Sequence, residues 1–540
     1  MAEIGIVGGG IAGLYTALYL KQRGYNIILF EASNRVGGRI HSHHFGPLVE
    51  NEDPFFEAGA MRVPLSSLHS CVFQLISYLN DHSKEEDGIQ LIPFTIQHPN
   101  NKIYLQGKMW DCQDTSIPAA LGLPSRYHNK TAHRILLDAI DPWLKLLWDD
   151  FERGVQEILR YDDMSFRHYL RTVVLWPHEV IDFVEVVMSQ TNQYDLSFTD
   201  MMLQTMHFNT PDWVTVKGGL SRITASAVSV LGRDCVVRNA PVTEIAEASS
   251  GKIKLTVGGF APQKRICNKV ILALPAVAIQ NIRVRPKWSP LKESAIRSLH
   301  EGPLYKMGLH FRTRFWENTS SPCFGGQTAT DLRVRWIVYP SNDQGSSQSG
   351  CLMVYSGMTD ALRWSWMTRR ERIRLVLEDL DNFFSKLGAN VYEHFVDAFD
   401  VNWPSEQSAG NTMYLPGQFS KFHDIMKQPE GNILFAGEHL SRHHTWIAGA
   451  IESAHLAVTQ LVDEGELPVL GADRIPPIAP VQFGAHVTGK VPIVFDETKS
   501  GPVVNCAFLR LTAGCGSFYK DHIGSRKVHG CLDPPTIYIY

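Results

Sequence analysis

Hydrophobic and polar positions follow two different periods in the first 31 residues. An apolar run, "IGIV", begins at residue 4 and ends in a glycine turn. The next segment, "IAGLYTALYLKQRG", has the spacing of an amphipathic helix that ends at Gly24, and "YNIILFEA" is a second apolar run. Strand, tight turn, helix and strand within roughly 30 residues predict a βαβ unit.

The same order of elements returns at residues 432–463. There "NILFA" predicts a buried strand, Gly437 and Glu438 stand at its carboxyl end, and a helix follows from Ile447. The helix is indicated by one apolar stripe with helical spacing. That stripe consists of Ile447, Ile451, Ala454, Val458 and Leu461.

Between these ends lies a segment of predicted helices, from about residue 130 to 213. Apolar residues recur at helical spacing in "TAHRILLDAIDPWLKLLWDDFERGVQEIL", where we expect Pro142 to begin a new first turn. Further helices are predicted at "WPHEVIDFVEVVMSQ" and "SFTDMMLQTMHF". We expect these helices to cover a functional site as a lid or funnel.

Periodicity is lost after about residue 466. From "LPVLGADRIPPIAPVQFG" onward the chain is rich in Pro and Gly and has no sustained pattern. A disordered tail is the first interpretation. An oligomerisation arm, or sequence that is not properly part of the gene product, is the alternative.

Composition narrows the classes of partner. The chain has 540 residues, of which 44% are hydrophobic and 20% charged, with a net charge of -4. This size allows two or three domains, and the charge provides no basic field for nucleic acid or anionic membranes. The longest nearly unbroken apolar run, "VILALPAVAI", is about half of the ~20 residues that a membrane span needs. We therefore predict no nucleic-acid partner and no membrane span.

The amino terminus and the cysteines indicate the cellular compartment of the protein. The first strand begins at residue 4, which leaves no room for a signal peptide, so we expect an intracellular, cytoplasmic protein. Six scattered cysteines without a CxxC pair indicate reduced thiols. They are Cys71, Cys112, Cys235, Cys267, Cys323 and Cys351.

The glycines of "GGGIAG" carry the first chemical signal. Gly8, Gly10 and Gly13 have the GxGxxG spacing inside a βαβ context. The first glycine permits the turn, the second lets the backbone approach a pyrophosphate, and the third lets helix and strand pack closely. Glu31 follows Gly13 by 18 residues, where a carboxylate can accept hydrogen bonds from ribose hydroxyls. The motif predicts a dinucleotide site with phosphates at a helix N-terminus.

A second glycine pair, which lies between two arginines, indicates which dinucleotide the site binds. "ASNRVGGRIHS" places Arg35 and Arg39 beside Gly37 and Gly38, which suits a second approach to the same pyrophosphate. The series "GGGIAG", Glu31 and "RVGGR" resembles the flavin-containing amine oxidase superfamily. A solvated basic turn is the alternative reading of the two arginines. The resemblance covers about residues 1–465 and implies FAD, bound without a covalent link.

The resemblance implies an α/β fold: a discontinuous Rossmann-like FAD-binding domain, a mixed-sheet substrate domain and a helical subdomain. We expect the FAD-binding domain at residues 1–65, 214–300 and 390–465, the substrate-binding domain at 66–130 and 301–389, the helical subdomain at 131–213, and the tail at 466–540. The implied cofactor-binding residues are Gly8, Gly10, Ala12, Gly13, Glu31, Ala32, Arg35, Gly38, Arg39, Gly59, Ala60, Met61, Arg62, Val242, Glu438 and Ile447. One stretch departs from the family pattern: "GNTMY" stands where a glycine-aromatic pair is more usual.

The substrate residues are also implied by resemblance, here to the L-amino-acid oxidase branch. "EAGAMRVP" assigns Arg62 to the substrate carboxylate, which a planar guanidinium can bind through two parallel donors. Tyr355 would add a second bond, Trp446 would form an aromatic wall, and the Thr445 carbonyl would accept the substrate ammonium. The alternatives are an ion pair of Arg62 with Glu57 or Glu52, and ordinary core positions for the two aromatic residues.

Lys306 is assigned by the same resemblance. "LYKMGLHF" is similar to the strand in which a lysine holds a water against flavin N5. A buried lysine needs such a partner. An outward-pointing lysine on an alternating strand is the other interpretation.

These parts imply oxidative deamination of an L-amino acid. Hydride would pass from Cα to FAD, the imino acid would hydrolyse to a 2-oxo acid and ammonia, and dioxygen would become hydrogen peroxide. An amino-acid monooxygenase, an amine or polyamine oxidase and a non-catalytic FAD-binding protein stay open, as does a homodimer. The histidine runs "HSHH" and "RHHTW" lack metal-ligand spacing, so no metal is predicted.

Overall fold

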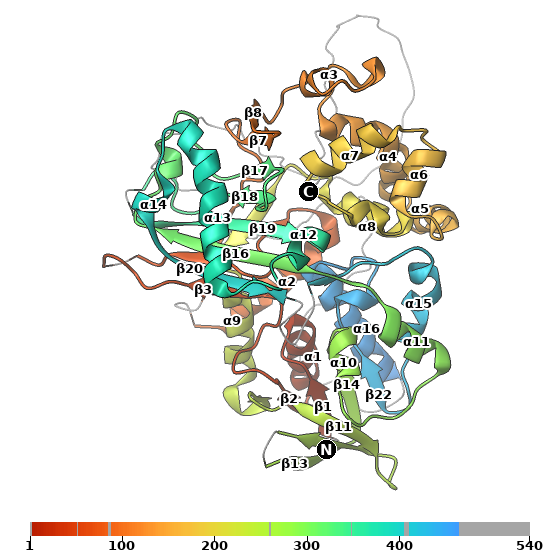
Figure 1. The fold of residues 1–540 in the computed structure, drawn as a ribbon. Coiled ribbons are helices and arrows are strands. Elements are labelled where there is room, and N and C mark those ends of the chain that lie inside the picture. The colour runs from red at the N-terminus through yellow and green to blue at the C-terminus, as the bar shows by residue number, and fades with distance from the viewer. Residues whose placement is uncertain are drawn as a thin grey trace, which may run out of the picture.

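A parallel sheet of five strands forms the first part of the molecule (Figure 1). The computed structural model describes residues 3–50, 52–84, 88–258, 261–346, 348–403 and 410–463. All pairings in this sheet are parallel. The strand order is β10 (Val236–Val237), β2 (Asn26–Phe30), β1 (Glu3–Val7), β14 (Lys269–Leu272) and β22 (Ile433–Phe435).

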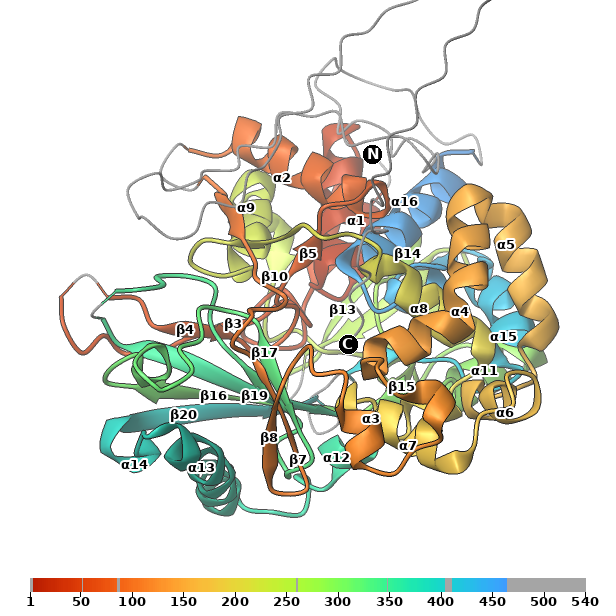
Figure 2. The ribbon, with the colours of Figure 1, turned by 90° about the horizontal axis from the view of Figure 1, so that it is seen from above.

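Three helices from distant parts of the chain cover one face of this sheet. Helix α1 (Ile11–Gln22) packs against α9 (Ser221–Leu231) and α16 (Ile447–Asp463), as Figure 2 shows from above. The predicted βαβ unit is thereby confirmed. The expected amphipathic pattern of α1 is wrong, because residues 11–20 are all buried between the sheet and these helices. A three-stranded sheet lies against the other face and consists of β11 (Val242–Glu247), β12 (Ile253–Val257) and β13 (Gln263–Cys267).

A mixed sheet of seven strands forms the second part. Only the β17–β7 pairing is parallel among the pairings of this sheet. Apolar residues of α13 (Arg369–Phe384) pack into the core on this sheet. The strand order is β20 (Phe395–Asn402), β16 (Leu304–Phe311), β19 (Gly350–Gly357), β18 (Trp336–Val338), β17 (Gln327–Thr330), β7 (Lys102–Leu105) and β8 (Lys108–Asp111).

Strand β20 departs from the expected division of the chain. It lies in the segment 390–465 that sequence analysis assigned to the FAD-binding domain, but it pairs antiparallel with β16. No local pattern could reveal this, because strand pairing across more than 80 residues depends on partners that the segment itself does not contain.

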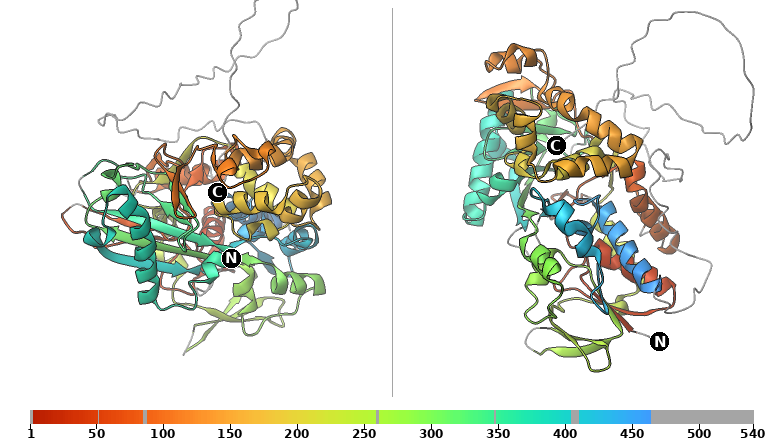
Figure 3. Two further views of the ribbon diagram at one scale, coloured as in Figure 1. Left: turned by 45° about the horizontal axis from the view of Figure 1, so that its top comes forward. Right: turned by 90° about the vertical axis from the view of Figure 1, so that its right-hand side faces the viewer.

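Helices form the third part, and Figure 3 shows them grouped on one side of the molecule. Pro142 lies inside the first helix, so the predicted new turn at this residue is wrong. Its side chain is exposed, where water can satisfy the carbonyl that proline leaves without a partner. The break falls instead at Asp150, whose side chain accepts from the Arg153 amide at 3.1 Å. The helices are α4 (Ala132–Asp149), α5 (Phe151–Ile158), α6 (Phe166–Thr172), α7 (His178–Val187) and α8 (Phe198–Thr205).

Shorter elements connect these three parts. The strands are β3 (Ser42–His44), β4 (Phe55–Glu57), β5 (Val63–Pro64), β6 (Leu91–Pro93), β9 (Trp213–Val216), β15 (Glu301–Gly302) and β21 (Asn411–Thr412). The helices are α2 (Ser70–His82), α3 (Ile117–Ala120), α10 (Ala276–Gln280), α11 (Pro290–Ser298), α12 (Met358–Leu362), α14 (Val391–His394) and α15 (Gln418–Lys427).

The predicted fold class is confirmed: α/β, with a parallel-sheet part assembled from distant segments. In the residues that the structure describes, no helix combines the length and the apolar character needed to cross a bilayer. The six cysteines named above are free thiols. The predicted tail at 466–540 lies outside the described residues.

Candidate functional site

A cavity of about 800 Å³ opens between the three parts of the fold. Its volume is in the range of sites that hold a cofactor or a ligand of similar size. The glycine turn after β1, the end of β2 and the start of α16 line one end. Residues of β16, β19 and the helical part line other walls. Every residue predicted to bind cofactor or substrate lines this cavity, except Gly13.

Two glycines of the glycine turn have different roles: one allows close packing and the other leaves space for a ligand. A Cβ at Gly13 would lie 2.0 Å from the carbonyl oxygen of Gly8, so Gly13 serves the packing of α1 on β1. A Cβ at Gly10 would have nothing within 4 Å, and Gly10 lines the cavity at the N-terminus of α1. The turn therefore leaves open space at the end of a helix where backbone N–H groups favour an anion. This arrangement fits a pyrophosphate.

Glu31 lies beside this space at the end of β2. Its Oε2 accepts a hydrogen bond from the Gly9 amide at 2.7 Å. Its Oε1 accepts from the amide and the hydroxyl of Ser33, at 2.9 and 2.8 Å. The turn and its following loop thus hold the carboxylate on the cavity wall, as a ribose site requires.

Arg39, which is partly exposed, forms an ion pair with the buried Glu438 on the cavity wall. Arg39 Nη1 lies 2.7 Å from Glu438 Oε1, which also accepts from the amide and hydroxyl of Thr412. Glu438 Oε2 accepts from the Thr445 amide at 2.7 Å. Burial raises the pKa of Glu438, but Arg39 and these donors outweigh burial and hold it at about 2. The carboxylate is therefore ionised and joins three chain segments at the cavity.

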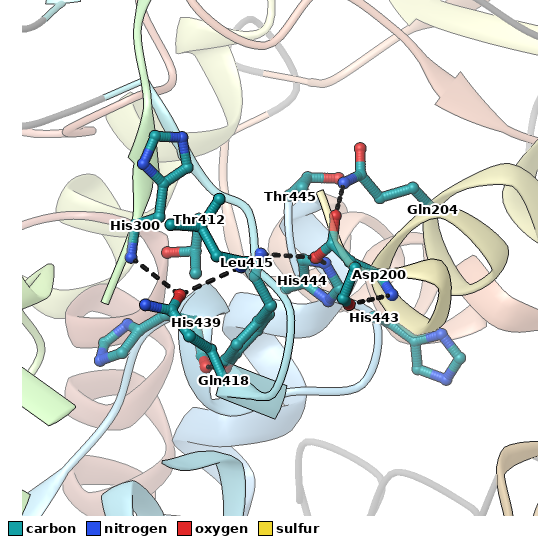
Figure 4. A network of polar contacts seen from close by, with 12 residues as sticks. Asp200, Gln204, His300, Thr412, Leu415, Gln418, His439, His443, His444 and Thr445 are labelled. Carbon is teal, nitrogen blue, oxygen red and sulfur yellow. Dashed lines mark hydrogen bonds and ion pairs between the residues drawn. The ribbon is translucent and has the colours of Figure 1, made fainter. Parts of the chain in front are cut away.

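The loop before α16 is held in a strained conformation. Thr445 has φ +71°, which is unfavourable for a β-branched residue. Figure 4 shows the network that holds this loop: His444 Nε2 lies 2.7 Å from Asp200 Oδ1 of α8, and Asp200 also accepts from Gln204. Burial lowers the pKa of His444, but Asp200 outweighs burial and raises it overall. The helical part thus positions Thr445 at the cavity.

Arg62 is a buried cation on the cavity wall. Its guanidinium carbon lies 5.4 Å from the ring centroids of both Phe94 and Trp213. Burial lowers its pKa to about 9, which the neighbouring Tyr355 only partly offsets. The buried guanidinium is a suitable donor for a ligand carboxylate.

The carboxylates considered as ion-pair partners of Arg62 bond to other groups. Glu57 accepts from the Ser42 hydroxyl at 2.8 Å and from the Leu220 amide at 2.7 Å. Glu52 accepts from the amide and hydroxyl of Ser349. The ion-pair alternative therefore has no support from these two carboxylates, and the role of Arg62 in ligand binding stays a prediction.

Lys306 is a second buried cation on the same wall. Its Nζ donates to the Gly59 carbonyl at 2.6 Å, and it stands opposite Tyr355 in the pairing of β16 with β19. Burial lowers its pKa to about 7, although Glu57 acts in the opposite direction. The outward-pointing alternative is wrong, because Lys306 is only 3% exposed.

Aromatic residues form the walls near these cations. Trp446 packs against Trp213 and Phe208, with ring centroids 6.0 and 5.7 Å apart. Trp403 lines the cavity and donates from Nε1 to the Ala58 carbonyl at 2.9 Å. In the atypical "GNTMY" stretch, Met413 lines the cavity, whereas Tyr414 is buried and donates to the carbonyl of His439.

Sequence analysis missed a polar wall contributed by the helical part. These residues lie among methionines and aromatic residues, so no local signal distinguished them from core. Gln190 is 3% exposed, and its Oε1 has no hydrogen-bond partner among the described residues. The wall consists of Ser189, Gln190, Thr191, Gln193 and Gln204. His69, which immediately precedes α2, also lines the cavity.

Comparison with known proteins defines the class. The pattern of the flavin-containing amine oxidoreductase family matches residues 11–462. A candidate bifunctional amine oxidase of Dictyostelium discoideum is 30% identical over 512 residues, covering 87% of this chain and 47% of that protein. This chain thus spans about half the length of that relative. L-amino-acid oxidase 4 of Hebeloma cylindrosporum is 28% identical, covering 86% of this chain and 83% of that protein.

A solved structure supports the fold. Cyclohexylamine oxidase from Brevibacterium oxydans IH-35A is 17% identical, with a TM-score of 0.66, and the match covers 86% of this chain and all of that one. The family match over residues 11–462 indicates a flavin-containing oxidoreductase. The chain belongs to the flavin-containing amine oxidoreductase family.

Proposed function

We propose that this protein is an FAD-dependent oxidase that deaminates an L-amino acid. FAD, held without a covalent bond, would accept hydride from the substrate Cα and let dioxygen take the electrons as hydrogen peroxide. Gly10, Glu31, Arg35 and Arg39 would hold its diphosphate and ribose, and the start of α16 at Ile447 would face its ring.

The substrate is held by residues of this chain. Arg62 binds the carboxylate and Tyr355 adds a hydrogen bond to it. Trp446 forms a wall beside the amine, whose N–H groups donate hydrogen bonds to the Thr445 carbonyl. Because both ends of the amino acid are held, its Cα–H bond is fixed in one orientation. Hydride transfer from Cα requires such a fixed orientation. Lys306 holds a water at the reacting centre, and the released imino acid hydrolyses to a 2-oxo acid and ammonia.

The buried Arg62 is the observation that carries this proposal. The residue is only 3% exposed and lines the cavity, and its guanidinium lies beside Phe94 and Trp213, where its planar donors can bind a substrate carboxylate. Oxidases of amines without a carboxylate would gain nothing from it. The resemblance to cyclohexylamine oxidase concerns the fold alone.

Anaerobic reduction tests the proposal. We expect L-amino acids to bleach the flavin and their decarboxylated amines to do so at least 100-fold less efficiently. In Arg62→Gln, kcat/KM for the amino acid should fall over 100-fold, which is a loss of about 3 kcal/mol in transition-state stabilisation. The kcat/KM for the matched amine should stay within threefold of the parent value. Equal losses for acid and amine would contradict the assignment.

Product analysis separates the remaining classes. An oxidase releases hydrogen peroxide and ammonia in equal amounts, whereas a monooxygenase yields an amide and carbon dioxide. A non-catalytic flavin protein would retain its colour with every amino acid tested.

A further inference from the structure

Three buried histidines form a row that begins at the cavity. His69 lines the cavity, and its Nε2 lies 3.0 Å from Nδ1 of His207. His207 Nε2 lies 3.3 Å from Nδ1 of His443. His443 Nε2 in turn lies 3.8 Å from Oε1 of Glu452 on α16. We call these three residues the histidine row.

The histidine row connects the substrate end of the cavity with a partly exposed carboxylate. His69, His207 and His443 are 1%, 1% and 5% exposed. The side chain of Glu452 is 20% exposed. Trp446, the wall assigned to the amine, lies beside the start of the row, with its ring centroid 5.0 Å from that of His69 and 5.3 Å from that of His207.

The three imidazoles are oriented head to tail. Each link joins Nε2 of one ring to Nδ1 of the next, so one tautomer satisfies every contact: Nε2–H donates outward and Nδ1 accepts. Burial lowers the pKa of all three rings, so they are neutral at rest. Neutral imidazole can accept a proton at one nitrogen while releasing one from the other.

Charged groups face the middle and the outer end of the row: His444 acts on His207 and His443, and Glu452 and Arg442 act on His443. Glu452 accepts a hydrogen bond from the Ser441 hydroxyl at 2.7 Å. Arg442 is paired with Glu152, and His444 with Asp200. Burying three imidazoles costs more free energy than burying apolar side chains, so packing alone does not explain the row.

We propose that the histidine row conducts the proton of the substrate ammonium from the cavity to Glu452; this inference rests on the proposed function. The ammonium N–H bond breaks and the proton binds His69 Nδ1, which leaves a neutral amine with its lone pair. His69 Nε2–H then passes to His207, and His207 Nε2–H passes to His443. His443 Nε2–H reaches Glu452 when the 3.8 Å separation of these two side chains closes to hydrogen-bond distance. No electrons move, and passage of one proton in reverse restores the tautomers.

The decisive variant is His207→Gln in the FAD-loaded enzyme, at the middle of the row. Glutamine keeps a polar side chain but cannot exchange one proton for another as imidazole does. At pH 7 we expect anaerobic flavin reduction by an L-amino acid to slow at least tenfold. The loss should disappear at a pH above the pKa of the substrate amine, and added imidazole should restore the rate at pH 7.

Proton release provides a readout independent of flavin reduction. A pH-indicator dye mixed with enzyme and substrate should report a proton that appears with reduction in the parent enzyme and more slowly in His207→Gln. His423→Gln is the matched control, since His423 is also buried but lies on α15 and contacts Asp424 and Lys427 instead. It should leave rate and pH profile unchanged.

The outcomes distinguish the two proposals. If His207→Gln slows reduction equally at every pH and imidazole has no effect, the row is structural and the inference is overturned. If His207→Gln does not fold, Glu452→Gln decides: a pH-dependent loss supports the row, and an unchanged profile overturns it. Failure of the parent holoenzyme to be reduced by any L-amino acid would instead overturn the proposed function.

Discussion

The two ends of the cavity differ in the sign and the surroundings of their charged side chains. At the proposed nucleotide end, the carboxylates of Glu31 and Glu438 are held by donors from the protein itself. At the substrate end, Arg62 and Lys306 are buried, and burial lowers the pKa of both. The first end is a set of satisfied charges around an open space, whereas the second concentrates positive charge on one wall.

The difference indicates what each end contributes. Satisfied ion pairs hold segments from distant parts of the chain in place without a ligand. Arg62 and Lys306 both line the cavity, so the positive charge that they carry there favours binding of an anionic group. Stability and substrate selectivity should therefore respond differently to mutations at the two ends.

The largest expected effect is at the glycine turn. Gly13→Ala places a Cβ 2.0 Å from the Gly8 carbonyl and should abolish both folding at 37 °C and flavin retention. Gly10→Ala is the matched control, because its Cβ meets nothing within 4 Å. It should leave the thermal stability of the flavin-free protein unchanged and lower FAD affinity at least tenfold, measured by flavin fluorescence. Normal FAD affinity in Gly10→Ala would disprove the phosphate cradle.

The next effect concerns the ion pair at the nucleotide end. Glu438→Gln should lower the free energy of unfolding by about 3 kcal/mol at pH 7, because Arg39 and the donors of Thr412 and Thr445 lose the buried carboxylate that accepts from them. Since the folded-state pKa is about 2 and the ordinary value is 4.5, the carboxylate stabilises the fold above pH 4.5. That contribution is lost as the pH falls from 4.5 through 2, so the two proteins should converge there.

Urea unfolding of the flavin-free proteins across this pH range measures the effect. Glu152→Gln is the control, because this exposed carboxylate pairs with Arg442 and should change stability by less than about 0.5 kcal/mol. A loss in Glu438→Gln that does not shrink in acid would show that the carboxylate charge is not its cause.

The smallest effect has the opposite sign and lies at the substrate end. Lys306→Met should raise the free energy of unfolding by about 2 kcal/mol at pH 6, because it removes a buried ammonium. The folded-state pKa of about 7 lies below the ordinary 10.5, so the unfolded chain binds the extra proton between these values. The cost is complete below pH 7 and is relieved as the pH rises to 10.5.

The difference between Lys306→Met and the parent should therefore be largest at pH 6 and small at pH 10. Lys108→Met, on the exposed side of β8, should show no such pH dependence. Lower stability of Lys306→Met at pH 6 would mean that the hydrogen bonds to Glu57 and Gly59 outweigh the burial of the charge.

Local patterns predicted the secondary structure around the glycine turn and α16. The βαβ unit, the strand at 433–435 and the helix from Ile447 follow from apolar periodicity and glycine spacing, which act between neighbours in the chain. Arg62, Tyr355, Lys306 and Trp446 were reached only through resemblance to a family. Nothing local marks these four residues, because the cavity joins them from separate segments.

Sequence alone determined the class of cofactor site, since turn geometry and helix N-termini depend on a few consecutive residues. Only the tertiary structure decided that β20 joins the seven-stranded sheet, that α1 is buried on all sides and that Pro142 stays within a helix. It alone aligned His69, His207 and His443, which are contributed by three distant segments. Long-range packing sets these contacts, and no periodicity along the chain encodes them.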